Sequence, residues 1–157
     1  MKLSTLLFTF AAVVAPAIAQ SGQASTTRYY DGLKGACGCG PATGSSMFSW
    51  QSNLGSGVYT AAVSQALYDS GGASWCGSGC GKCYKLTSTG NAACSSCGAG
   101  GASGQSIIVM ATNLCPNNGN AQWCPAVGGS NQYGYQYHFD IMSTSSSIPE
   151  VLGDNPV

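Results

Sequence analysis

The stretch NQYGYQYHFD, residues 131–140, alternates aromatic side chains with small or polar ones. Its rings fall at every second position from Tyr133 to Phe139, and His138 and Asp140 occupy alternate places. A period of two is typical of a β-strand, on which successive side chains point to opposite faces. We therefore predict a strand whose aromatic face packs in a core and whose other face carries His138 and Asp140. His138 is the only histidine of the chain, and Asp140 is one of five acidic residues.

Other segments extend this β pattern. Strands are predicted at Thr27–Tyr30, at Cys83–Thr89 and at Ser106–Thr112, of which the last is a continuous apolar run typical of a central strand. Apolar residues near helical spacing predict one helix over Val58–Ser70. The expected fold is mostly β, a barrel or sandwich with long disulfide-pinned loops and one or two short helices.

The amino terminus has the features of a secretory signal. Lys2 precedes an apolar run from Leu6 to Val14 and the small-residue triplet at 17–19. We predict cleavage after Ala19, and the run is too short for a membrane span. The mature chain, residues 20–157, has room for one domain. The expected protein is secreted, extracellular, monomeric and independent of membranes.

The composition narrows the range of partners. Only 6% of the residues are charged and the formal net charge is zero, so the chain lacks the basic surface that nucleic-acid binding requires. Abundant Gly, Ser, Asn and Thr, together with Tyr and Trp, suit a polar, uncharged ligand such as a glycan.

Nine cysteines in a secreted chain of this size predict a disulfide framework. Because nine is odd, either one thiol is free or one cysteine pairs with a residue beyond Val157. The spacing of Cys76, Cys80 and Cys83 also suits zinc. An oxidising compartment favours disulfides, so we expect no metal site.

Carboxylates are the remaining candidates for catalysis. The sequence has no nucleophile elbow, no phosphate-binding loop and no second histidine. Asp31 and Asp140 each follow aromatic residues at the end of a predicted strand. A glycosidase needs such a pair, one protonated and one ionised. The other acids suit surface roles: Asp69, Glu150 and Asp154.

Several ordered motifs resemble glycoside hydrolase family 45, most closely its fungal endoglucanase V branch. The motifs run from about Thr27 to Met142: TRYYDG, GACGCG, GASWCGSGCGKCYKLTSTG, QSIIVMATNLCPNNGNAQWCP and NQYGYQYHFDIM. The resemblance implies a six-stranded double-psi β-barrel and hydrolysis of internal β-1,4 bonds of cellulose or another β-1,4-glucan with inversion, without metal or cofactor.

The resemblance also assigns roles to individual residues. It makes Asp140 the general acid and Asp31 the general base, and it places Tyr29 near the catalytic centre. Asn120 matches an asparagine that assists or replaces the base in a sister branch. We expect the neighbourhood of Asp140 to disfavour its anion, with His138 as a positioning neighbour.

Asp31 lies near Arg28 and Lys34 in sequence, which favours its ionised form. Inversion needs room for a water molecule, so we expect the two carboxyl groups to stand roughly 6.5–9.5 Å apart.

Two departures from the family pattern stand out. Some members carry a further Asp shortly before HFD, where this chain has NQY at 131–133. Relatives also continue past the GDN at 153–155 with more strands and another cysteine, so we expect a carboxy-terminally truncated domain whose ninth cysteine has lost its partner.

Two other functions are compatible with the pattern. Expansins share the barrel and an HFD motif, which leaves a non-hydrolytic wall-loosening or glycan-binding protein as the alternative. They lack the aspartate of TRYYD, however, and they add a second domain. A small secreted effector with a barwin-like barrel would need neither acid.

Overall fold

The computed structural model describes residues 21–39, 46–48, 51, 54, 58–98 and 100–142. The predicted signal peptide and the chain after Met142 lie outside these residues. The strands are β1 (Ala24–Tyr29), β2 (Val58–Ser64), β3 (Cys83–Thr87), β4 (Ser106–Cys115) and β5 (Tyr137–Met142). Two helical elements lie wholly within these residues, the 3₁₀ turn η1 (Ala36–Gly38) and the α-helical turn α1 (Gln65–Tyr68).

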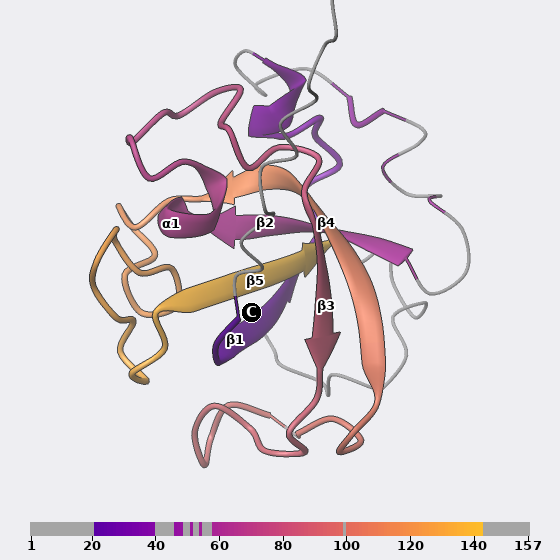
Figure 1. Cartoon of the computed structure of the whole chain (residues 1–157), viewed down its shortest axis with the longest axis vertical. Helices are drawn as coiled ribbons and strands as arrows, with labels where there is room; N and C mark the ends of the chain where they lie inside the picture. Colours follow the sequence, from indigo (N-terminus) through magenta and orange to yellow (C-terminus); the bar gives the residue numbers. More distant parts are fainter. Residues whose placement is uncertain are drawn as a thin grey trace, which may run out of the picture.

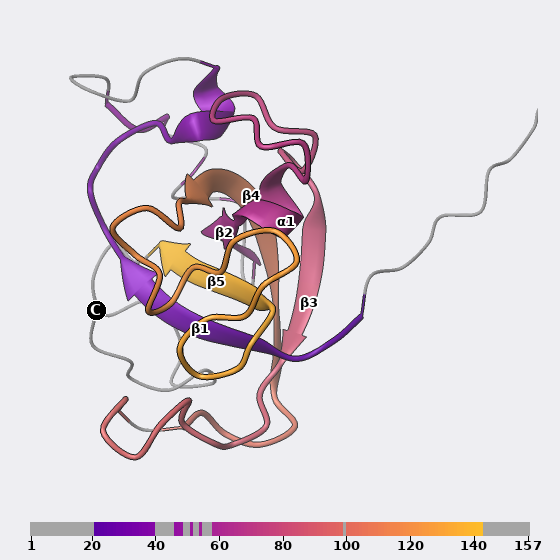
Figure 2. The same cartoon turned by 90° about the vertical axis from the view of Figure 1, so that its left-hand side faces the viewer.

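The strands form one sheet in the order β1-β5-β2-β4-β3. The pairs β1–β5 and β2–β4 are parallel, whereas β2–β5 and β3–β4 are antiparallel. The sheet curls strongly (Figures 1 and 2), so that residues of β3 and of the start of β1 line the same hollow of about 660 Å³. The prediction of a mostly β fold is confirmed, and within the described residues the sheet is a half-barrel.

The predicted helix over Val58–Ser70 is wrong. Its first seven residues are strand β2, and only Gln65–Tyr68 make a helical turn. β2 lies between β5 and β4, and Thr60 to Ser64 are all buried. A strand covered on both faces reads as a continuous apolar run, which spacing alone does not distinguish from a buried helix.

The predicted strand over 131–140 is only half right, because β5 begins at Tyr137. The preceding residues form a turn around Asn131, whose Oδ1 accepts the backbone N–H groups of Tyr133 and Tyr135. The alternation of aromatic residues there does not reflect a strand. The other predicted strands are confirmed, with β1 starting earlier and β4 ending later than expected.

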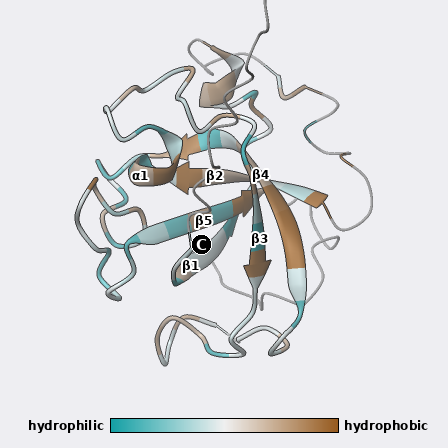
Figure 3. Ribbon diagram, viewed as in Figure 1, coloured by the Kyte–Doolittle hydropathy of each residue, from teal (hydrophilic) through white to brown (hydrophobic). Residues whose placement is uncertain are grey.

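One face of the sheet packs against the main core. Phe139 and Ile141 of β5 are buried there with Val63 of β2 and Val109 of β4. In Figure 3, brown hydrophobic stretches lie on β2 and β4. The Tyr84 ring of β3 meets Phe139 edge to face at 5.2 Å. The aromatic residues of β5 thus face the core as predicted, and His138 and Asp140 lie on the opposite face. No helix among the described residues is long and apolar enough to cross a membrane.

The predicted disulfide framework is confirmed, with eight of the nine cysteines paired and Cys83 exposed and free. Cys76 and Cys80 of the zinc-like spacing are both in disulfides. The bonds join Cys37 to Cys80, Cys39 to Cys76, Cys94 to Cys97 and Cys115 to Cys124.

Because Cys83 is exposed, one thiol per chain should react with Ellman's reagent without denaturant. Cys83→Ser should abolish this reaction and leave the melting temperature unchanged. A native protein with no reactive thiol, or with more than one, would contradict the pairing described.

Candidate active site

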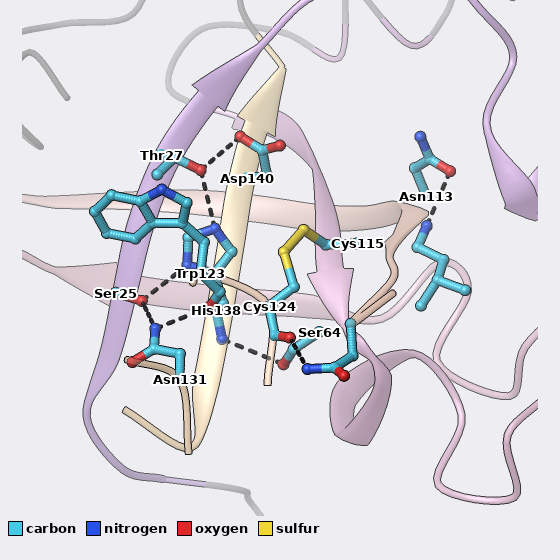
Figure 4. The surroundings of a disulfide bond; sticks show 12 residues. Ser25, Thr27, Ser64, Asn113, Cys115, Trp123, Cys124, Asn131, His138 and Asp140 are labelled. Atoms are coloured by element: carbon cyan, nitrogen blue, oxygen red, sulfur yellow. Dashed lines mark hydrogen bonds between the residues drawn. A yellow bond between two sulfur atoms is a disulfide. The ribbon is translucent and has the colours of Figure 1, made fainter. Parts of the chain in front are cut away.

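The parallel pairing of β1 with β5 positions the side chains of the candidate site. Ser25 lies opposite His138, and Thr27 lies opposite Asp140. Residues two apart on a strand share a face, so these four side chains project on the same side of the sheet (Figure 4). The sequence ASTTRY therefore brings two small hydroxyl side chains against the histidine and the acid.

A chain of hydrogen bonds joins these side chains. The amide of Asn131 donates to Ser25 Oγ at 2.8 Å, and Ser25 Oγ lies 2.8 Å from His138 Nδ1. His138 Nε2 lies 2.9 Å from Thr27 Oγ1, which donates to Asp140 Oδ1 at 2.7 Å. Thr27 gives its only hydroxyl proton to Asp140, so His138 Nε2 must carry the imidazole proton and donate it to Thr27 Oγ1. His138 Nδ1 then accepts the hydroxyl proton of Ser25, and Ser25 Oγ in turn accepts from Asn131. The chain of donors runs in one direction and ends at Asp140.

His138 itself is fully buried. Burial lowers its pKa to about 4, so the imidazole is neutral under mildly acidic and neutral conditions. Its backbone N–H donates to Ser64 Oγ, and its ring lies 5.9 Å from that of Trp123. A neutral, buried imidazole with both ring nitrogens hydrogen-bonded is suited to orienting its neighbours.

The environment of Asp140 favours its protonated form. Burial raises its pKa, the hydrogen bond from Thr27 lowers it, and the charge of Asp31 raises it, with a net result of about 6. The aromatic residues that flank Asp140 in sequence belong to the other face. Asp140 instead shares its face with Thr27 of β1 and Ala62 of β2, and the packing on this face shields its carboxyl group from water.

Asp31 occupies a different setting. It is exposed, and its Oδ1 accepts the backbone N–H of Leu33 at 2.9 Å across a turn at Gly32, where φ is 68°. Its charge acts on both Asp140 and Tyr29. The two acids named from the sequence therefore belong to one electrostatic site, one shielded from water and one open to it.

Tyr29 completes this group. It is partly buried, and burial raises its pKa well above the usual value, with further increases from the charges of Asp31 and Asp140. Asn113 Nδ2 donates to its hydroxyl oxygen at 3.3 Å. The tyrosine therefore remains protonated at the pH at which Asp140 titrates.

Asn120 is exposed in the turn before Trp123. Its backbone carbonyl accepts the N–H groups of Trp123 and Cys124, and its own N–H donates to the carbonyl of Asn117. Within the described part of the chain, its hydrogen bonds therefore go to nearby backbone and not to either acid.

Four residues of this site were not predicted from the sequence: Ser25, Thr27, Asn131 and Asn113. Thr27 could have been found, because it alternates with Tyr29 along one face of the predicted strand. Ser25 lies before the predicted start of that strand, so the prediction did not include it. The roles of Asn131 and Asn113 depend on contacts between residues that are distant in sequence, which no local pattern indicates.

One cluster has the composition of a metal site. Potential ligand atoms of Cys115, Cys124 and His138 lie within 4.8 Å of one another. The two sulfur atoms are joined as a disulfide, however, and both nitrogens of His138 have hydroxyl partners. This donor set does not suit a metal ion.

Thr27→Val should raise the pKa of Asp140 above its value of about 6, by roughly one unit, because a hydrogen bond that favours the anion is lost. The substitution also removes the acceptor of His138 Nε2–H and should destabilise the fold by about 1–3 kcal/mol. A ¹³C NMR titration of the carboxyl group measures the first effect, and urea unfolding measures the second. Thr27→Ser keeps the hydroxyl and is the matched control; an unchanged pKa in the valine variant would contradict the contact.

Comparisons with known proteins identify both endoglucanase and expansin relatives. A family model described as EXPB1-like domain 1 matches residues 24–157. Endoglucanase-5 of Hypocrea jecorina is 71% identical over 135 residues, which cover 86% of this chain and 53% of that protein. The chain thus spans about half the length of this relative. Expansin-A7 of Arabidopsis thaliana is 38% identical over 86 residues, covering 55% of this chain and 24% of the expansin.

The solved structures that match this chain include two endoglucanases. Cel45A, a β-1,4-D-endoglucanase of the mussel Mytilus edulis, matches with a TM-score of 0.70 at 44% identity, over 85% of this chain and 73% of that one. The GH45 endoglucanase EG27II in complex with cellobiose matches with a TM-score of 0.69 at 40% identity, over 85% and 75% of the two chains. These matches confirm the double-psi β-barrel fold. The chain belongs to glycoside hydrolase family 45.

Proposed function

We propose that the chain is the catalytic domain of a secreted endo-β-1,4-glucanase that hydrolyses internal bonds of cellulose or a related β-glucan with inversion. The observation that carries this proposal is the unequal pair of acids. Asp140 has a pKa raised to about 6 by burial, and the exposed Asp31 lies within its electrostatic reach. Two carboxyl groups in contrasting environments are what acid–base hydrolysis of a glycoside needs.

Asp140 is the general acid in this scheme. Thr27 donates to Oδ1, which leaves Oδ2 as the oxygen that carries the acid proton. That proton passes to the glycosidic oxygen as the bond to the anomeric carbon breaks. The chain of donors from Asn131 through His138 holds the carboxyl group in this orientation.

Asp31 is the general base. It removes a proton from a water molecule, whose oxygen attacks the anomeric carbon from the face opposite the leaving group. One proton is taken up and one is given out in each turnover, so exchange with solvent restores both acids. Asn120 remains the alternative base, and its exposed position in a turn leaves its side chain open to the solvent side.

The remaining proposals follow from the nature of such a substrate. A neutral polysaccharide suits a chain with few charges, and inversion by two carboxyl groups requires no metal or cofactor. A structural match contains cellobiose, a disaccharide of β-1,4-linked glucose, which supports a glucan as the partner. We expect the protein to act outside the cell as a monomer.

A second candidate function is favoured by the expansin-like family model and by the expansin relative. A non-hydrolytic wall-loosening protein would weaken cellulose without breaking covalent bonds. The discriminating experiment incubates the full chain with soluble carboxymethylcellulose and counts reducing ends, with Asp140→Asn as the control. Reducing ends formed by the wild type alone support the proposal. Weakening of cellulose paper without reducing ends would support the expansin-like function instead.

A further inference from the structure

A row of paired residues crosses the sheet at the level of Asp140. Thr27 pairs with Asp140, Asp140 with Ala62, and Ala62 with Asn113. Paired residues on neighbouring strands share a face, so these side chains project on the side of the candidate site. Adjacent strands stand about 4.7–4.9 Å apart, so the backbones of Asn113 and Asp140, two strands apart, are separated by about 10 Å. The residue between them is Ala62, whose side chain is a single methyl group. In Figure 4 Asn113 lies beyond β2 from Asp140.

Asn113 reaches this face because β4 contains a bulge. The register shifts so that Ala61 pairs with Ala111 and Ala62 pairs with Asn113, which leaves Thr112 unpaired. Regular alternation would have turned Asn113 to the core face with Val109 and Ala111. Thr112 is left buried, with no hydrogen-bond partner for its hydroxyl among the described residues. A bulge re-aims a side chain in this way, and here it does so at a local cost.

The amide of Asn113 is held in one orientation. Its Oδ1 accepts the backbone N–H of Ala36 at 2.7 Å and that of Leu114 at 2.9 Å. Gly35 makes the first contact possible: its φ is +73°, and a Cβ there would lie 2.8 Å from the carbonyl oxygen of Thr112. With Oδ1 occupied twice, Nδ2 is the atom that faces Tyr29.

This orientation decides the direction of the Tyr29 hydroxyl. Asn113 Nδ2 can only donate, so the phenol oxygen accepts and its own O–H must point elsewhere. Tyr29 follows Thr27 by two residues on β1 and therefore shares its face. Tyr29 packs against the buried cluster that contains Ala62, the residue that pairs with Asp140.

We propose that Asn113 is a positioning residue that holds the Tyr29 oxygen and so directs the phenol proton toward an oxygen atom of the reacting sugar or water. The inference rests on the glucanase function proposed above. The inference also gives the bulge in β4 a role, because the bulge turns the amide of Asn113 to the face of the sheet that carries Asp140.

The test is a double-mutant cycle in the full chain. Asn113→Asp keeps an oxygen that accepts the backbone N–H groups of Ala36 and Leu114, but it replaces the donor to Tyr29 by an acceptor. The phenol O–H should then donate to the new carboxylate and should no longer be available to the substrate. Tyr29→Phe removes the proton altogether. Each single variant should lower kcat by about 10²-fold, the typical loss for one preorganised donor, with little change in KM. In the Tyr29→Phe background, Asn113→Asp should cost nothing more.

Controls separate this inference from a simple effect on folding or charge. Asn91→Asp adds the same charge on an exposed loop and should leave kcat unchanged. If Asn113→Asp does not fold, Asn113→Thr replaces it in the cycle, since threonine suits a strand and retains an oxygen. Full activity of either Asn113 variant, or an equal loss with and without the Tyr29 hydroxyl, would overturn the inference. A wild type that releases no reducing ends would instead overturn the proposed function.

Discussion

Asp140→Asn is expected to lower kcat on soluble β-glucan by about 10²–10⁴-fold, because the leaving oxygen loses its proton donor. The asparagine keeps an oxygen for the hydrogen bond from Thr27, so the site should retain its shape. In the wild type, activity should fall as the pH rises through about 6, the pKa of the acid. Near-wild-type kcat in a folded variant would exclude Asp140 as the acid.

The same substitution should stabilise the protein at neutral pH. The folded state raises the pKa of Asp140 from 3.8 to about 6, so the folded chain binds this proton more tightly than the unfolded chain does. Stability from this group is therefore lost as the pH rises from about 4 to 6, and the loss is about 3 kcal/mol. Asparagine carries no charge to desolvate. Urea unfolding at pH 7 should show a higher free energy of unfolding for Asp140→Asn than for the wild type.

His138 produces the opposite dependence in the same range. Its pKa falls from 6.5 to about 4 on folding, so stability from this group is lost as the pH falls from 6.5 to 4. In the wild type the two slopes oppose each other between about pH 4 and 6. In Asp140→Asn only the pH dependence from His138 should remain, so the free energy of unfolding should be lower at pH 4 than at pH 6. A variant that is equally stable at both pH values would contradict the burial of a neutral imidazole.

Asp31→Asn is the substitution with the second largest expected effect. If Asp31 activates the attacking water, the variant should lose about 10²–10⁴-fold in kcat. Asn120→Ala should then cost less than tenfold, an effect smaller than that of the base. Both residues are exposed, so both proteins should fold normally and share the melting temperature of the wild type.

The reverse ranking would move the role of the base. A partial loss in Asp31→Asn together with a larger loss in Asn120→Ala would assign water activation to the turn that precedes Trp123. Added azide or formate offers a further control, since a small anion can replace a missing carboxylate base. Recovery of activity in Asp31→Asn but not in Asp140→Asn would support the two separate roles.

The local sequence predicted much of the fold and both acidic residues of the candidate site. Asp31 and Asp140 stood out because few acids exist and both end aromatic strand segments, and the structure places them in one electrostatic site. β3 and β4 followed from short β-rich runs. The family motifs, rather than composition, supplied the barrel and the substrate class.

The errors have a common physical origin in tertiary contacts. β2 was mistaken for a helix because its burial on both faces removes the alternation that marks a strand. The turn at 131–136 alternates like a strand, but the Asn131 side chain satisfies its backbone. The bulge at Thr112 was invisible because it is defined by pairing with β2. Such features depend on partners far along the chain.

In the proposed mechanism, Asp140 and Asp31 act as acid and base in a single displacement at the anomeric carbon of a β-1,4-glucan. Proton NMR of the first sugar released from cellopentaose tests it directly, because the anomeric signals of the new reducing end are read before mutarotation. We expect the α-anomer to appear first and the β-anomer only later. An initial β-anomer would show retention of configuration and would contradict the single displacement.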